Sequence, residues 1–355
     1  MDDLRKYSLK VFITILIIAL VFIMVYIIYN TRNLFLLAFL SFILSLLIRN
    51  IAEILIKKFK FNKYVSLVLG IIAVILILFL PFISISVPFI SQVQKFSNNM
   101  PSIIVGFQSL ISKFSLRFPF LAKTINPDTL AQNFYLSIQN IMGSSISYIA
   151  TASGWVADFF ILIVISVFIA INPTEYLEMF LRFIPQKNIE NTLATIREIK
   201  EVLKSWLVGT LLAIFFVGLL TTIGFWIIGL DFFLVFGIAA GFLEIIPYFG
   251  PFLGCLAPAI YALIQAPNKI YPIIIIYIII QFIENTIFIP MIMKKQIKLP
   301  PAITILVILI LGKLLGLMGI IVAIPLFASA MLLFEKTYNK KIIKSHNIEE
   351  EKNDQ

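Results

Sequence analysis

The stretch that decides the fold is Glu244-Ile-Ile-Pro-Tyr-Phe-Gly-Pro-Phe-Leu-Gly254. It places a carboxylate, two prolines and two glycines inside a run that is otherwise apolar enough to lie in a bilayer. Pro247 and Pro251 have no N–H to donate to the preceding turn, and Gly250 and Gly254 permit the backbone angles, including positive φ, that follow a break. Irregular backbone at membrane depth persists only where it is buried in protein or lines a wet cavity. We therefore predict a broken helix on a transport pathway; the alternative is a proline-kinked packing helix.

The composition predicts a polytopic membrane protein. The chain is 61% hydrophobic and only 13% charged, which is far from the balance of a soluble domain. The formal net charge of +10 is spread over short Lys and Arg clusters beside apolar runs, where positive charge fixes orientation and contacts anionic lipid. We therefore expect the lipid bilayer as a partner and exclude nucleic acid. A single cysteine, Cys255, and a single histidine, His346, support neither a disulfide nor a metal site, and no cofactor is expected.

Residues 1–90 predict three N-terminal spans. The first two, about 11–29 and 34–48, are expected to form a close hairpin around a tight turn at Asn30 to Asn33. A basic loop follows at 49–63. By the positive-inside rule this loop and the N-terminus are cytoplasmic.

The middle of the chain alternates between mixed and apolar segments. Residues 91–152 predict an extracytoplasmic region of two or three short helices, or a solvated connector, and residues 153–172 predict a fourth span. Residues 173–204 carry charges of both signs and predict a cytoplasmic helical loop. A transport core at 205–335 and a cytoplasmic polar tail at 336–355 complete the chain.

Counting membrane crossings predicts two hairpins in the core. The stretch 232–264 lies between a helix that starts inside and one that ends inside at Lys294, Lys295 and Lys298, so both of its ends are outside. The stretch 302–334 lies between that cluster and the basic tail, so both of its ends are inside. Its break is Leu311-Gly-Lys-Leu-Leu-Gly-Leu-Met-Gly319.

The core therefore contains two units, each a full helix followed by a hairpin, in opposite orientations. Secondary transporters use such inverted repeats to build an alternating-access site. The expected fold is an all-α polytopic membrane protein with about six full spans, two broken or re-entrant helical hairpins in inverted orientation, and a helical extracytoplasmic loop. In the alternative geometry each hairpin arm crosses fully.

Polar residues inside the membrane identify a candidate pathway. Gln281, Glu284 and Asn285 share one helix face, while Glu244 and Lys313 lie near the two breaks. A charge near the bilayer centre costs about 3 kcal/mol on insertion scales, so an intramembrane ionisable residue is a functional candidate; the alternative is a structural salt bridge to Lys313. The candidate residues for the transport pathway and for ion or proton coupling are Glu244, Pro247, Tyr248, Gly250, Pro251, Gln281, Glu284, Asn285, Lys313, Gly316 and Gly319.

Motifs along nearly the whole chain resemble those of the autoinducer-2 exporter family of bacterial inner-membrane proteins. They are Phe183-Ile-Pro185, Ser205-Trp-Leu-Val-Gly209, Gly229-Leu230, Ile246-Pro-Tyr-Phe-Gly-Pro251, Gln281-x-x-Glu-Asn285, Pro290-x-Ile-Met293, Gly316-x-x-Gly319 and Ala323-Ile-Pro325. The resemblance implies a transporter fold, an inner-membrane location and a homo-oligomer. It implies export of autoinducer-2 for some members and sodium or lithium/proton antiport for others. Thr210, Lys294 and Pro300-Pro301 depart from the common pattern.

The function predicted is a secondary transporter that exports a small hydrophilic, autoinducer-2-like solute and is coupled to the proton motive force, with both termini cytoplasmic. A sodium (lithium)/proton antiporter is the alternative, and a non-transporting membrane scaffold is the alternative of another class. An enzyme and an ATP-driven pump are disfavoured, because the sequence has no GxSxG, HExxH or GxxxxGK[ST] motif.

The predicted orientation can be measured by cysteine labelling. In a Cys255→Ser background, single cysteines replace lysines expected inside (Lys57, Lys187, Lys295, Lys340) or outside (Lys113, Lys269). An impermeant maleimide added to intact cells should label only positions 113 and 269. Labelling of position 295 from outside would contradict the inverted hairpins.

Overall fold

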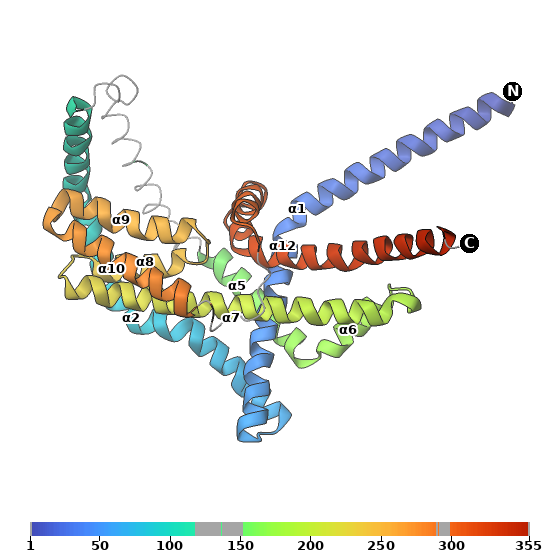
Figure 1. Cartoon of the computed structure of the whole chain (residues 1–355), viewed down its shortest axis with the longest axis horizontal. Coiled ribbons are helices and arrows are strands. Elements are labelled where there is room, and N and C mark those ends of the chain that lie inside the picture. Colours follow the sequence, from blue (N-terminus) through green and yellow to red (C-terminus); the bar gives the residue numbers. More distant parts are fainter. Residues whose placement is uncertain (1, 118–135, 137–151, 289, 291–298, 354–355) are drawn as a thin grey trace.

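The computed structural model describes residues 2–117, 136, 152–288, 290 and 299–353, and they are helical or lie in turns between helices (Figure 1). The elements are α1 (Asp2–Phe59), α2 (Lys63–Arg117), α5 (Ala152–Ile171), α6 (Pro173–Leu181), η1 (Gln186–Asn188), α7 (Ile189–Ile227), α8 (Phe233–Leu243), α9 (Phe249–Gln265), η2 (Pro267–Lys269), α10 (Ile270–Ile283), η3 (Glu284–Phe288) and α12 (Pro301–Asn353). Most of the predicted extracytoplasmic region after Arg117, and the cluster Lys294, Lys295 and Lys298, lie outside the described residues.

Four helical segments in the described part of the chain are long and apolar enough to cross a membrane: Asn30–Phe59, Gln186–Ile227, Pro267–Phe288 and Pro301–Lys336. A fifth span results if α5 and α6, which meet at an angle of 83°, are counted together. Val11–Met24 and Lys63–Leu78 are shorter apolar helical segments. The chain is thus a multi-pass membrane protein whose described residues form helices, with four or five spans of full length among them.

The predicted turn at Asn30–Asn33 is wrong, because α1 runs through it without interruption. The segment contains neither proline nor glycine, and Thr31 Oγ1 donates a hydrogen bond of 2.7 Å to the carbonyl of Ile27 one turn earlier. The polar side chain is therefore satisfied within the helix. The first two predicted spans form one long element, and residues 11–24 are exposed along their whole length.

No helix break marks the predicted boundary between the third span and the external region. α2 continues past Pro81, Pro88 and Pro101 to Arg117 as one helix of 55 residues. Each proline removes one backbone hydrogen bond, which membrane helices tolerate where neighbouring groups compensate. The first part of the predicted external region, up to Arg117, is therefore part of α2 rather than a separate short helix.

A seam of small residues joins α7 to α8. A Cβ atom added at Gly241 would lie 2.8 Å from Gly218 Cα, and one added at Gly237 would lie 2.7 Å from Thr222 Cα. Residue numbers rise along α8 as they fall along α7, so the two helices are antiparallel. The spacing of four residues on both sides is the small-xxx-small pattern that lets helix backbones approach closely.

The predicted break in the first hairpin stretch separates α8 from α9. A Cβ added at Gly254 would lie 3.3 Å from Ala240 Cα, so α9 folds back along α8. α8 has 11 residues and is about 16 Å long at ~1.5 Å per residue, roughly half of a 30 Å hydrocarbon core.

α12 also reverses direction, at Gly316. This residue has φ 66° and ψ −151° inside an otherwise helical stretch. A Cβ added at Gly312 would lie 2.9 Å from Ile320 Cγ1, although eight residues of straight helix would separate the two positions by about 12 Å. Figure 1 shows α12 as two arms meeting at a sharp bend.

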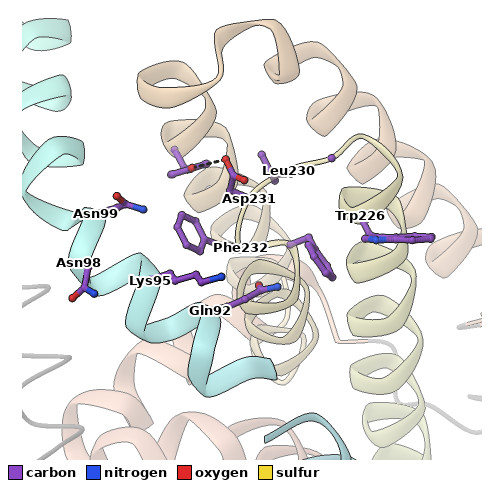
Figure 2. Close-up of a pocket in the computed structure, with 11 residues that line it drawn as sticks. Gln92, Lys95, Asn98, Asn99, Trp226, Leu230, Asp231 and Phe232 are labelled. Atoms are coloured by element: carbon purple, nitrogen blue, oxygen red, sulfur yellow. Dashed lines mark hydrogen bonds between the residues drawn. The ribbon is translucent and has the colours of Figure 1, made fainter. Parts of the chain in front are cut away.

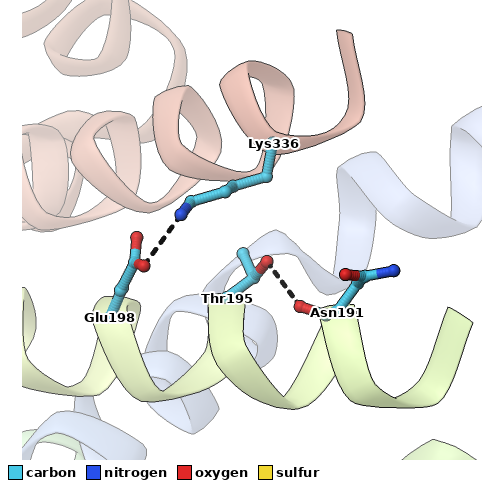
Figure 3. A network of polar contacts seen from close by, with 4 residues as sticks. All are labelled: Asn191, Thr195, Glu198 and Lys336. Atoms are coloured by element: carbon cyan, nitrogen blue, oxygen red, sulfur yellow. Dashed lines mark hydrogen bonds and ion pairs between the residues drawn. The ribbon is translucent and has the colours of Figure 1, made fainter. Parts of the chain in front are cut away.

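The far arm of α12 returns to α7 and continues as a helix to Asn353, where a polar tail was predicted. Lys336 Nζ forms an ion pair of 2.8 Å with Glu198 Oε1, and Thr195 Oγ1 donates to the carbonyl of Asn191 at 2.9 Å (Figure 3). Both partners of the ion pair are 46% exposed, so this contact contributes at most about 1 kcal/mol to the free energy of unfolding.

The seam predicts a specific stability loss. Gly241→Val should destabilise the purified protein by at least about 1–3 kcal/mol, because the added atoms meet the backbone of α7 and neither helix can yield locally. Ala239→Val adds two carbon atoms at an exposed position of α8 and should change stability little. Denaturation of both variants in detergent measures the difference, and equal stabilities would show that α7 and α8 do not need the close approach.

Candidate functional site

A cavity of about 530 Å³ lies at the break between α8 and α9. It is enclosed by α7, by the break itself, by α10 with η3, and by Ile324 of α12. The predicted residues that line it are Glu244, Pro247, Tyr248, Pro251, Gln281, Glu284 and Asn285. Two stretches about forty positions apart in the sequence therefore meet at one polar site.

The backbone of the break is a tight γ-turn centred on Tyr248. Phe249 N–H donates a hydrogen bond of 2.8 Å to the carbonyl of Pro247, and Tyr248 has φ 67° and ψ −47°. This turn of positive φ is rare for a residue with a side chain and costs on the order of 1–3 kcal/mol. Pro251 lies in the first turn of α9, where an N–H has no helical partner to lose. The turn therefore ends the helical path of α8 and sets the chain in the direction of α9.

Gly250 is required for a reason that differs from the prediction. Its φ is not among the positive values of the described glycines, which are Gly229 and Gly316. A Cβ at this position would instead overlap the carbonyl oxygen of Leu243 and lie 2.6 Å from its carbonyl carbon. The end of α8 and the start of α9 touch backbone to backbone, and glycine supplies the space.

Two carboxylates line the cavity, and one of them is hydrogen-bonded to an amide. Gln281 Nε2 donates a hydrogen bond of 3.0 Å to Glu244 Oε1. Glu284 is only 6% exposed, and its Oε2 atom has no hydrogen-bond partner among the described residues. Because two anions in a site of low dielectric constant repel each other, the site favours a proton or a cation beside them.

A π-helical turn places Glu284 and Asn285. η3 begins at Glu284 and widens the end of α10, and such turns are frequent at functional sites. Asn285 Nδ2 donates to the carbonyl of Gln281 at 2.8 Å, which holds the amide against the helix. Phe288 stacks on Phe216 with ring centroids 4.3 Å apart and closes one side of the cavity.

The residues predicted around the second break do not line this cavity. Lys313 is exposed, and the ion pair that the described residues form joins Lys336 to Glu198 instead. The alternative of a salt bridge between Lys313 and either glutamate is therefore not formed in the structure. Gly316 and Gly319 shape the bend of α12; a Cβ added at Gly319 would lie 2.6 Å from Leu315 Cβ.

Sequence reasoning missed the contribution of α7 to the cavity wall. Trp206, Gly209, Thr210 and Ala213 all line it. Their spacing of i, i+3, i+4 and i+7 places them on one helix face, and three of them are small. This stripe was the signal that could have identified them. No group of three or more His, Cys, Asp or Glu side chains that could hold a metal ion occurs within the described ranges.

These features define a polytopic membrane protein with a polar, carboxylate-containing cavity at a broken helix. Residues 13–339 match the model of the AI-2E family transporters, so the chain belongs to this family. Over 266 residues it is 28% identical to YueF of Bacillus subtilis (strain 168), which is named as a transport protein, and covers 72% of each chain. It is 33% identical to the transport protein YrrI of the same strain over 139 residues, which is 39% of each chain. It is 24% identical to the permease PerM of Escherichia coli (strain K12) over 234 residues, 64% of this chain and 66% of PerM.

The close contact at Gly250 predicts graded effects on the cavity. Gly250→Ala should reduce transport and Gly250→Val should abolish it, since each added carbon pushes α9 away from Leu243 while leaving membrane insertion intact. Leu253→Val, at a partly exposed position of the same helix, is the control. Flux in proteoliposomes and elution volume in detergent are measured together. Normal flux for Gly250→Val would mean that the break is a packing kink.

Proposed function

We propose that this protein is a secondary transporter that exports a small hydrophilic solute similar to autoinducer-2, driven by the proton motive force. One observation supports this most strongly: Glu244 and Glu284 share a cavity with Gln281 and Asn285 at a helix break. Each such charge is expensive in the bilayer, and packing alone gives no reason to place two together.

Glu284 is the proposed proton-coupling group. It is the more enclosed of the two carboxylates, and its Oε2 atom has no partner among the described residues. Protonation from one side of the membrane and release to the other would alternate the charge of the cavity. Glu244, held by Gln281, is proposed as the second proton- or cation-responsive group. The amides of Gln281 and Asn285 would contact the hydroxyl groups of the solute.

The proposed topology combines four or five full spans with two hairpins that enter the inner membrane of a bacterial cell from opposite sides, both termini being cytoplasmic. Two measurements support it. α8 is about half as long as the hydrocarbon core is thick, and the contact of Gly312 with Ile320 requires α12 to fold back. Alternating access would then follow from movement of the hairpins around the cavity.

A homo-oligomer is also proposed. The apolar surface of α1 between Val11 and Met24 is exposed in the single chain, and lipid or neighbouring copies would cover it.

A sodium or lithium/proton antiporter is the second candidate. Carboxylate and amide oxygens from Glu244, Glu284 and Asn285 line the same cavity, and unwound helices coordinate monovalent cations in other transporters. In this version the cation and the proton compete for the carboxylates, and no organic solute is required. A membrane scaffold without transport is the remaining alternative, and it predicts that both glutamates can be neutralised without effect.

The variant Glu284→Gln tests whether transport is coupled to protons through this side chain. The amide keeps the shape of the side chain but can neither bind nor release a proton. Purified protein in liposomes with an imposed pH difference should accumulate solute above equilibrium, and the variant should reach only the equilibrium level. Glu190→Gln removes an exposed carboxylate at the start of α7 and should transport normally.

The driven species separates the candidates. Autoinducer-2-like sugars, sodium and lithium are offered to the same vesicles. Uphill movement of the sugar supports the exporter, and uphill movement of an ion alone supports the antiporter. If nothing moves although the protein is folded and correctly oriented, the scaffold is favoured.

A further inference from the structure

A second cavity, of about 730 Å³, lies at the opposite end of α8 from the carboxylate cavity. Its walls come from α2, from the loop between α7 and α8, and from single residues of α7, α8 and α9. Figure 2 shows Lys95 and Gln92 of α2 extending toward Asp231 and Phe232 of the loop. The length of α8, about 16 Å, separates this outer cavity from the break.

The loop that forms one wall is held in a fixed shape. Gly229 and Phe232 both have positive φ, 64° and 59°. Lys269 Nζ donates to the carbonyl of Gly229, and Gln92 Oε1 accepts the N–H of Leu234 at 3.1 Å. Phe232 packs its ring edge-on against Tyr261, with centroids 5.4 Å apart. These contacts hold the loop on both sides of Asp231, so the position of its carboxylate is fixed.

Opposite charges in this cavity do not neutralise each other. Within the described chain, Lys95 and Asp231 form no ion pair, so their charged atoms are more than 4.0 Å apart. Tyr261 OH donates to Asp231 Oδ2 at 3.3 Å, and the described residues supply no partner for Oδ1 or for Lys95 Nζ. The cavity thus offers one cationic and one anionic contact on facing walls.

We propose that the outer cavity binds small zwitterions of the α-amino-acid type, with the carboxylate at Lys95 and the ammonium at Asp231. A zwitterion satisfies both charges at once through charge-assisted hydrogen bonds. A simple anion or cation meets an attracting and a repelling group together and gains less. The exposed ring of Trp226, which lines the cavity, gives an apolar side chain a surface to contact.

The cavity volume suits this class of ligand, because small-molecule sites span roughly 300–1,000 Å³. The same charge pattern occurs on the headgroup of phosphatidylethanolamine, and the site follows the apolar part of α2, Lys63–Leu78, along the chain. A free amino acid and this lipid are thus two sources of one chemistry. Binding here goes beyond the proposed transport function and does not depend on it.

The test uses the full-length protein in nanodiscs of phosphatidylglycerol, which contain no zwitterionic lipid. Calorimetry compares L-leucine with isoamylamine, which lacks its carboxylate, and 4-methylvalerate, which lacks its ammonium. L-leucine should bind at least about tenfold more tightly than either, since one charge-assisted hydrogen bond accounts for about that factor. Equal binding of the three would overturn the proposal.

Variants then locate the site. Lys95→Gln and Asp231→Asn should each weaken L-leucine binding about tenfold, while Lys113→Gln, an exposed lysine on the same helix, should not. The exchanged pair Lys95→Asp with Asp231→Lys should recover part of the affinity, because a zwitterion can bind in the reversed direction; misfolding would not give this recovery. Unchanged affinity in both single variants would overturn the assignment.

Two further arms separate the sources and the sites. Phosphatidylethanolamine added to the nanodiscs competes with L-leucine if the headgroup occupies the cavity, and native mass spectrometry should then find less retained lipid on Lys95→Gln; without competition the ligand is the free solute. Glu284→Gln should leave L-leucine binding intact whatever it does to transport. Loss of binding in that variant would place the ligand in the carboxylate cavity and refute the outer site.

Discussion

The structure depends on how the chain interrupts a helix inside an apolar run while keeping its backbone groups hydrogen-bonded. Between Leu243 and Phe249 the γ-turn at Tyr248 and the bonds from Ile246 N–H to the Leu243 carbonyl and from Gly250 N–H to the Ile246 carbonyl, 2.9 and 2.7 Å, replace helical bonds. Each unsatisfied group in hydrocarbon would cost several kcal/mol. The strain at Tyr248 is smaller than that cost, so the turn is the less expensive solution.

Close packing at glycines then fixes where the break lies. Gly218, Gly237 and Gly241 bring α7 and α8 together, and Gly254 brings α9 against Ala240 and Tyr277. Without side chains at these positions the helices approach to backbone contact, and contact of this kind has little freedom to slide. The two carboxylates therefore meet because the hairpin has one position relative to α7 and α10.

The two cavities differ in chemistry in a way that follows from the burial of their charged side chains. At the inner end of α8 the buried Glu284 and the amide-bound Glu244 form an acidic site. At its outer end Lys95 and Asp231 are both exposed, so their charges cost little and can attract a polar solute from water. In the two proposals, zwitterion binding at the outer cavity and proton coupling at the inner one are separate properties of the two ends of one helix.

The sequence by itself determined the class, the break at Pro247 to Pro251 and the polar helix face of Gln281, Glu284 and Asn285, because hydrophobicity, proline geometry and helical spacing are local properties. It predicted a turn at Asn30 to Asn33 that does not form, since Thr31 finds its partner within α1. It also expected the glycines to supply any positive φ at the break, whereas Tyr248 adopts it. Only the tertiary structure decided that Glu244 and Glu284 line the same cavity, that Lys313 does not line it, and that α7 forms part of its wall. These outcomes depend on contacts between helices far apart in the chain, which are set by how closely small residues let the backbones pack.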